Sequence, residues 1–223
     1  MSRTFASRLT MGTLSLLVAS LPASAHVVFN EFDLMTKNEA GWHFLWMGFT
    51  HILPLGFDHI LFVLSLYLLS PKLKTIMVQA TAFTVAHSIT LGLAMYGVIN
   101  PPSSVIEPLI AISIVVVAIE NIFWPKLRVS RIGIVFLFGL VHGLGFAGAL
   151  IELGLPQKHF FTTLITFNIG VELGQIAVIL LGYLLFGYWF SGKEYYHKRI
   201  VVPISLAVVL MAGYWTVERI FFT

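Results

Sequence analysis

The sequence predicts an all-α integral membrane protein, a bundle of six transmembrane helices whose first helix is broken near Pro54. Hydrophobic residues make up 58% of the 223-residue chain and charged residues only 10%, against about 25% charged residues in soluble globular proteins. Six apolar runs approach the ~20 residues that a membrane-spanning helix needs; they lie at 53–69, 75–97, 102–124, 131–151, 160–187 and 199–221. Only short segments with turn or charge signals separate them, so we expect one helical domain over residues 53–223.

The first 25 residues have the pattern of a secretory signal peptide. Arg3 and Arg8 precede a short apolar stretch, and the sequence Ala-Ser-Ala at 23–25 offers a small-residue cleavage site. We predict cleavage after Ala25, which leaves His26 as the first mature residue and 26–52 as a periplasmic segment with a short interfacial helix. The alternative is a seventh, uncleaved span, but the apolar part is short for one.

The distribution of basic residues predicts the orientation of the bundle in a bacterial inner membrane. With residues 26–50 outside, the loops at 70–75, 124–132 and 188–199 face the cytoplasm, and they hold Lys72, Lys74, Lys126, Arg128, Arg131, Lys193, Lys198 and Arg199. External segments keep only Lys37, Lys158 and Arg219, so the positive-inside rule places both mature termini in the periplasm. The basic loops then face anionic lipid, and no nucleic-acid partner is expected.

The first span contains a predicted helix break. Pro54 removes a backbone donor and clashes with the preceding turn, and Gly56 loosens the helix further. Residues 42–52 are therefore predicted to form a short half-helix or interfacial segment. Broken helices at membrane depth are tolerated where they line a cavity, and they often form ion sites.

Polar and ionisable side chains recur inside the predicted spans. A charged group at the bilayer centre costs roughly 2.5–3.5 kcal/mol on insertion scales, so such groups face the bundle interior and have partners. The first span carries Asp58 and His59, with His51 just before the break. The second to fifth spans add Thr84, His87, Ser88, Glu107, Glu120, Asn121, His142, Asn168, Glu172 and Gln175.

Position along each helix predicts that most of these groups meet. At ~1.5 Å per residue, His87 and His142 lie ~18 Å and ~17 Å from the inner ends of their spans. Glu172 lies ~18 Å from the outer end of its span, whereas Asp58 and Glu107 are only ~8 Å from the outer surface. The groups are expected to converge between the outer half and the middle of the bundle.

Helix faces support this convergence. Asn168, Glu172 and Gln175 are spaced i, i+4, i+7 and share one face, and Thr84 lies on the same side of its helix as His87. Glu120 is the exception, because its position near the inner surface predicts a solvated helix end.

The residue types indicate a divalent transition metal. The chain has no cysteine, so disulfides and thiolate metal sites are excluded. Histidine and carboxylate without thiol suit nickel, cobalt, zinc or manganese, and imidazole favours the first three. Carboxylates beside the histidines would also orient their rings. The alternative is a proton relay or a structural polar network, but three histidines with two or three carboxylates in one bundle favour a metal or proton site.

Four stretches together resemble the HupE/UreJ family, in particular its signal-bearing branch: HILPLGFDHILF, FTVAHSITL, VIEPLIAISIVVVAIEN and FGLVHGLGFAGAL. The resemblance covers roughly residues 42–185. It implies a nickel or cobalt permease with metal-handling roles for His51, Asp58, His59 and His142, and an acid at the position of Glu107. One departure concerns the choice of metal, because the Asp58–His59 pair begins seven residues after His51, where family members have five or six.

We therefore expect an inner-membrane permease for a divalent metal, with nickel or cobalt first and zinc as a further candidate. The expected metal ligands are His51, Asp58, His59, His87, His142 and Glu172. The expected neighbouring or pathway residues are Glu107, Asn168, Ser88, Thr84, Glu120 and Asn121, and the mature amino terminus with His26 would form a capture site. The partners are the bilayer and the metal ion, with a homo-oligomer left open. The alternatives are a zinc-dependent intramembrane hydrolase and a non-transporting accessory protein.

Overall fold

The structure is a computed structural model, and it describes residues 32, 34–69, 72–124, 130–153 and 159–222. The predicted signal peptide and His26 lie outside the described residues. Within them the chain is helical and contains no strand. The fold is therefore the all-α architecture that the composition predicts.

Five of the described helical segments are long and apolar enough to cross a membrane, and a sixth is obtained if α3 and α4 form one broken span. The four uninterrupted helices that follow α4 are α5 (Leu73–Met95), α6 (Ser103–Phe123), α7 (Ser130–Leu153) and α8 (Phe160–Gly182). The π-helix η2 (Tyr183–Gly187) and α9 (Tyr188–Phe190) extend α8, and η3 (His197–Val201) leads into α10 (Val202–Phe221).

The predicted break near Pro54 separates α3 (Lys37–Ile52) from α4 (Phe57–Leu69), whose axes differ in direction by 68°. α3 begins earlier than the predicted residue 42, because a capping box at Thr36 fixes its start. The Thr36 side chain accepts from the Glu39 backbone N–H, and the Glu39 carboxylate accepts from the Thr36 backbone N–H. The first span is thus two half-helices that meet at an angle.

Glycines let α3 and α8 approach at backbone distance. A Cβ added to Gly48 would lie 2.0 Å from the Phe167 carbonyl oxygen, and one added to Gly170 would lie 2.0 Å from that of Leu45. Small residues that bring two backbones together are typical of helix packing in membranes. This packing fixes the height at which α3 ends and α4 begins.

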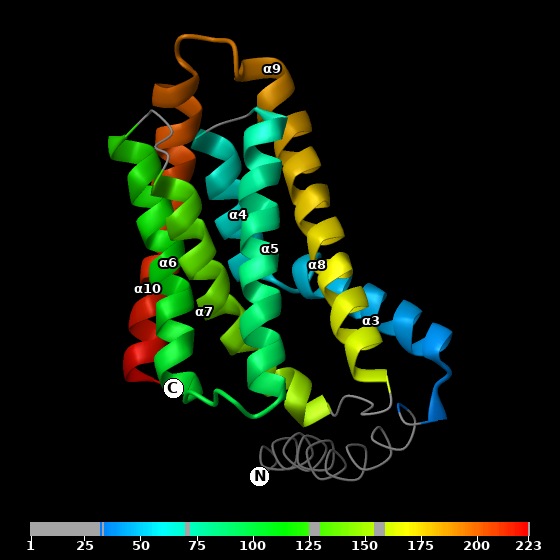
Figure 1. The fold of residues 1–223 in the computed structure, drawn as a ribbon. Helices are drawn as coiled ribbons and strands as arrows, with labels where there is room; N and C mark the ends of the chain where they lie inside the picture. The colour runs from blue at the N-terminus through cyan, green and yellow to red at the C-terminus, as the bar shows by residue number, and fades with distance from the viewer. Residues whose placement is uncertain (1–31, 33, 70–71, 125–129, 154–158, 223) are drawn as a thin grey trace, which may run out of the picture.

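Most of the helices run along one common direction, so the bundle has two ends (Figure 1). At the lower end in this view lie the start of α6 and α8 and the C-terminal end of α10, and at the upper end lie α9 and the end of α4. We call the lower end the cavity end, because the cavity described below is lined by Glu107 of α6 and Arg219 of α10. The upper end is called the opposite end.

Candidate metal centre

Three histidines from three helices form a group that could hold a metal ion. His51 lies in the last turn of α3, His59 in the first turn of α4 and His87 in α5, and one ring nitrogen from each lies within 4.8 Å of the others. A metal–imidazole bond is ~2.0–2.1 Å long, so nitrogens on opposite sides of one ion are ~4.2 Å apart. A small contraction of the group would therefore bring all three nitrogens into coordination distance.

The helix break brings His51 and His59 together. Their ring centroids are 4.7 Å apart, and each lies about 6 Å from the His87 ring, at 6.3 Å and 6.1 Å. Without the 68° turn between α3 and α4, the two half-helices would not point these rings at one place. The break is thus the feature of the sequence that builds the group.

Two nitrogens of this group are buried without a hydrogen-bond partner. They are Nε2 of His51 and Nε2 of His87, and His87 has no exposed surface. A buried polar atom without a partner costs ~1–3 kcal/mol, and native structures contain few such atoms. An ion bound between the rings would satisfy both nitrogens.

Asn168 of α8 orients the His87 ring. The Asn168 side-chain nitrogen donates to the Leu164 backbone carbonyl at 2.8 Å, which turns its Oδ1 toward His87 Nδ1, 3.2 Å away. Nδ1 must carry the proton to donate this bond, so Nε2 keeps the lone pair that binds metal. A hydrogen-bonded partner of this kind is typical of metal-binding histidines.

His142 of α7 lies next to the group rather than in it. Its Nδ1 is 3.4 Å from His59 Nε2, and its Nε2 is 3.0 Å from the Ser113 hydroxyl oxygen. It is 1% exposed. His142 can therefore exchange a hydrogen bond with His59, or become a fourth ligand after a small rotation of the ring.

The structure places three of the predicted carboxylates outside this group. Asp58 forms an ion pair with Arg219, with 2.9 Å between Oδ2 and Nη2. Glu172 accepts hydrogen bonds from the Thr81 and Thr84 hydroxyls of α5. Glu107 lines the neighbouring cavity. Each carboxylate lies near the histidines along the bundle, but none belongs to the group of three.

A cavity of about 730 Å³ adjoins the histidine group. His51, His59 and His142 are in its wall, together with Asp58 and other residues from five helices, namely Met47, Thr50, Leu55, Gly56, Phe57, Glu107, Ile110, Gly145, Phe146, Trp215 and Arg219. The loop between α3 and α4 forms part of this wall. The helix break therefore lines a cavity, as the sequence predicts.

Aromatic rings cover the group on the side of the opposite end. The Phe62 ring centroid lies 5.1 Å from Phe83, 6.2 Å from Phe138 and 5.3 Å from the His142 ring. Phe83 in turn lies 5.0 Å from the ring of His142 and 5.8 Å from that of His59. The group is thus open toward the cavity and closed by rings on its other side.

Comparison with known proteins finds a family that the chain matches. The family model described as HupE / UreJ protein matches residues 30–219 of the chain. The chain belongs to the HupE/UreJ family. No curated protein and no solved structure matches it significantly. The resemblance seen in four short stretches therefore extends over nearly the whole bundle of this HupE/UreJ protein.

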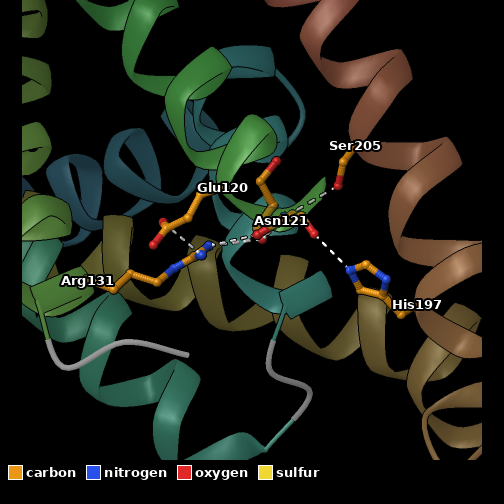
Figure 2. Close-up of polar contacts among 6 residues, drawn as sticks. Glu120, Asn121, Arg131, His197 and Ser205 are labelled. Carbon is orange, nitrogen blue, oxygen red and sulfur yellow. Dashed lines mark hydrogen bonds and ion pairs between the residues drawn. The ribbon is translucent and has the colours of Figure 1, made fainter. Parts of the chain in front are cut away.

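A second buried polar cluster of this HupE/UreJ protein links Arg131 and Glu120 to Asn121, Ser205 and His197 (Figure 2). The Arg131 side chain has no exposed surface; its Nη1 lies 3.0 Å from Glu120 Oε2 and its Nη2 lies 3.1 Å from Asn121 Oδ1. Nη2 also donates to the backbone carbonyl of Ser65 in α4. We call this set, with Ser205 and His197, the Arg131 cluster.

Asn121 extends the Arg131 cluster to the last helix. Its side-chain nitrogen donates to the Ser65 carbonyl at 2.7 Å and approaches the Ser205 hydroxyl at 3.4 Å. The backbone carbonyl of Asn121 lies 2.9 Å from His197 Nε2. The cluster therefore joins α4, α6, α7, η3 and α10 near one end of the bundle.

The Arg131 cluster corrects two sequence-based predictions. Glu120 is not a solvated helix end, because it pairs with a fully buried guanidinium. Arg131, counted among the basic residues of the cytoplasmic loop 124–132, is instead a buried residue in the first turn of α7. The sequence did carry a signal, since an arginine at the start of an apolar run and an acid at the end of the preceding run can meet in an antiparallel helix pair.

The predicted pathway residue Ser88 and the buried Gln175 lie outside the group of three histidines. The Ser88 hydroxyl donates to the Thr84 backbone carbonyl at 2.6 Å, within α5. Gln175, on the same face of α8 as Asn168 and Glu172, is fully buried, and neither polar atom of its side chain has a partner. A polar stripe therefore continues along α8 from Asn168 toward the opposite end.

Proposed function

We propose that this chain is a permease for a divalent first-row transition metal, with nickel and cobalt as the first candidates and zinc as a further one. The observation that supports it most is the three-histidine group beside a cavity that His51 and His59 line, with two buried imidazole nitrogens that lack partners. The HupE/UreJ family suggests a membrane protein related to nickel or cobalt. Imidazole donors without thiolate agree with these metals.

The proposed orientation puts the cavity on the periplasmic side of a bacterial inner membrane, with both mature termini on that side. The basic residues at the opposite end then face the cytoplasm, as the positive-inside rule requires. In this orientation the ion enters from the cavity and reaches His51, His59 and His87. In the proposed orientation the rings of Phe62 and Phe83 lie on the cytoplasmic side of the histidine group, so we infer an outward-open state.

A zinc-dependent hydrolase is the second candidate, because three histidines beside an open cavity also suit a catalytic zinc with a free coordination position. The polar stripe on α8 favours transport. A hydrolase needs only the group and the cavity, whereas a permease needs polar side chains beyond the group, and Glu172 and Gln175 provide them. Ions would then move between α5 and α8 after leaving His87.

The test is uptake by liposomes that contain the purified protein. Nickel, cobalt, zinc and manganese are offered separately, and the metal inside and the metal bound to the protein are both measured. We expect uptake of nickel or cobalt by the wild type and its loss in His87→Ala. His159→Ala is the matched control, because His159 lies at the start of α8, away from the group, and makes no capping bond through its side chain.

The outcomes separate the candidates. Bound metal with no uptake of any ion by the wild type would overturn the permease and favour the hydrolase or an accessory protein. Equal uptake by wild type and His87→Ala would show that transport does not depend on the histidine group.

A further inference from the structure

The cavity beside the histidine group is much larger than a hydrated metal ion. Its volume is about 730 Å³. A water molecule in the liquid occupies ~30 Å³, so an ion with six waters fills roughly 200 Å³. Pockets that bind small organic molecules measure ~300–1,000 Å³. The cavity therefore has the size of a small-molecule site.

The wall of the cavity also has the composition of a small-molecule site. Apolar side chains such as Phe57, Ile110 and Trp215 make up much of it, and a few charged groups stand among them. Binding sites for organic ligands combine apolar walls with a small number of polar groups in this way. A hydrated dication gains little from aromatic walls, whereas the carbon skeleton of an organic ligand packs against them.

Arg219 is the positively charged side chain in the wall that the described residues form. Its Nη2 donates to Asp58 at 2.9 Å and its Nη1 donates to the Glu107 backbone carbonyl at 3.2 Å, so the guanidinium has a fixed orientation beside the cavity. Its side chain is 19% exposed and in reach of a ligand. The guanidinium, although paired with Asp58, can donate a further hydrogen bond to the carboxylate oxygen of a chelator that the metal leaves free.

We propose that the cavity receives the metal as a complex with a small carboxylate-bearing chelator, such as an amino acid or a hydroxycarboxylate. This rests on the proposed function and names the form in which the ion arrives. Arg219 binds the carboxylate of the chelator, and the apolar wall packs against its carbon skeleton. His51 and His59, at the base of the cavity, then take the metal.

The transfer is a ligand exchange. Bonds between the metal and the chelator break as bonds between the metal and the imidazole nitrogens form, and the oxidation state of the metal does not change. The chelator leaves through the mouth of the cavity. The two unpartnered nitrogens, Nε2 of His51 and of His87, supply lone pairs for the exchange.

The first experiment measures docking without transport. Cobalt(III) complexes do not exchange ligands on the time scale of binding, so a cobalt(III) complex of histidine tests the cavity without giving up its metal. We expect it to bind the wild-type protein in detergent, measured by calorimetry, and to bind Arg219→Gln roughly ten- to hundredfold more weakly, the usual effect of losing a charged hydrogen bond. Cobalt(III) hexaammine, which has no carboxylate, should not bind.

The second experiment measures uptake of nickel by liposomes at one fixed concentration of free nickel. The concentration of the nickel complex is raised with L-histidine in one series and with histamine, which lacks the carboxylate, in the other. We expect the rate to rise with the histidine complex only, and this rise to disappear in Arg219→Gln. Glu218→Gln is the matched control, since Glu218 is adjacent in sequence but does not line the cavity.

These two experiments distinguish failure of the chelate inference from failure of the permease proposal. Uptake that depends on free nickel alone, with no binding of the cobalt(III) histidine complex, would overturn the inference and leave the permease intact. Binding of that complex with no uptake by the wild type would overturn the permease and leave the cavity as a chelate site. If Arg219→Gln does not reach wild-type levels in the membrane, Trp215→Ala tests the same wall without changing its charge, and undiminished docking there would overturn the inference.

Discussion

The imidazole of His87 and the side-chain amide of Asn168 lie 3.2 Å apart, between Nδ1 and Oδ1, in the buried interior of the bundle. They belong to α5 and α8, 81 positions apart in the sequence. The bond sets which nitrogen of His87 carries the proton. It therefore prepares the other nitrogen to bind an ion before any ion is present.

Replacing Asn168 should weaken metal binding through His87. Asn168→Leu removes the acceptor at similar volume, and losing a hydrogen-bonded partner of a metal ligand typically costs ~10–100-fold in affinity. Asn168→Asp keeps an acceptor oxygen and should keep the affinity. Competition titration of cobalt against a coloured chelator measures both, and equal affinities of Asn168→Leu and wild type would show that this bond has no role in the group.

Because α3 packs closely on α8, adding a single methyl group at Gly170 should disturb the histidine group. In Gly170→Ala the new Cβ would meet the Leu45 carbonyl oxygen at 2.0 Å, so α3 must move and take His51 with it. We expect lower thermal stability in detergent and weaker metal binding. In Gly213→Ala the new Cβ has no neighbour within 4 Å, and such a change in a helix usually stabilises by ~0.4–1 kcal/mol. Similar melting temperatures of the two variants would contradict this prediction.

Breaking the Arg131–Glu120 pair should destabilise the protein. Arg131→Met leaves the Glu120 carboxylate without its partner, and breaking a buried pair costs ~3–5 kcal/mol. The effect should be near ~3 kcal/mol, the lower end of that range, because the Glu120 side chain is 13% exposed. The double variant Arg131→Met/Glu120→Leu should recover part of the loss, since apolar replacements of a buried pair are often tolerated.

Thermal unfolding in detergent, followed by circular dichroism, checks the three Arg131–Glu120 proteins. A double variant less stable than Arg131→Met would contradict the prediction, since Glu120 would then stabilise the protein even without Arg131.

Reporter fusions check the proposed orientation. The charge distribution predicts a cytoplasmic signal from reporters inserted near Lys72 and Lys198 and a periplasmic signal from one fused after Thr223. A cytoplasmic C-terminus would reverse the proposed entry side, although it would leave the histidine group unchanged.

The sequence was sufficient for the helices and for the histidines. Hydropathy located the spans, Pro54 and Gly56 located the break, and positions along the helices predicted that His59, His87 and His142 would converge. These features depend on local chemistry and on depth, both of which can be read along one chain.

The partners of the charged groups could not be predicted in the same way. Asp58 pairs with Arg219, which is 161 positions away, and that choice depends on α10 lying beside α6 and α4. Arg131 lies where the predicted loop 124–132 overlaps the predicted span 131–151, and hydropathy does not show that its side chain turns into the bundle. Hydropathy does not show which helices pack against each other, or whether a residue at the end of a helix is buried.

The ion pair of Asp58 with Arg219 changes what Asp58→Asn should do. If Asp58 were a metal ligand, the protein would need its carboxylate to bind metal. The structure instead places this carboxylate in the cavity wall, outside the group of three histidines. The pair is partly exposed, with side-chain exposures of 22% for Asp58 and 19% for Arg219, and exposed pairs contribute only ~0–1 kcal/mol to stability. Asp58→Asn should therefore insert and fold like the wild type.

The metal stoichiometry of Asp58→Asn should also be unchanged, because His51, His59 and His87 remain. Uptake of a free cation should slow, because the Arg219 guanidinium loses the carboxylate that balances its charge. Measuring bound cobalt by absorption and uptake rate on the same preparation separates the two roles of Asp58. Salt adds an independent check, since an effect of charge at the mouth of the cavity should shrink at high ionic strength. Loss of bound cobalt in Asp58→Asn, with normal membrane abundance, would make this carboxylate a ligand and would require α4 to turn toward the group when the ion binds.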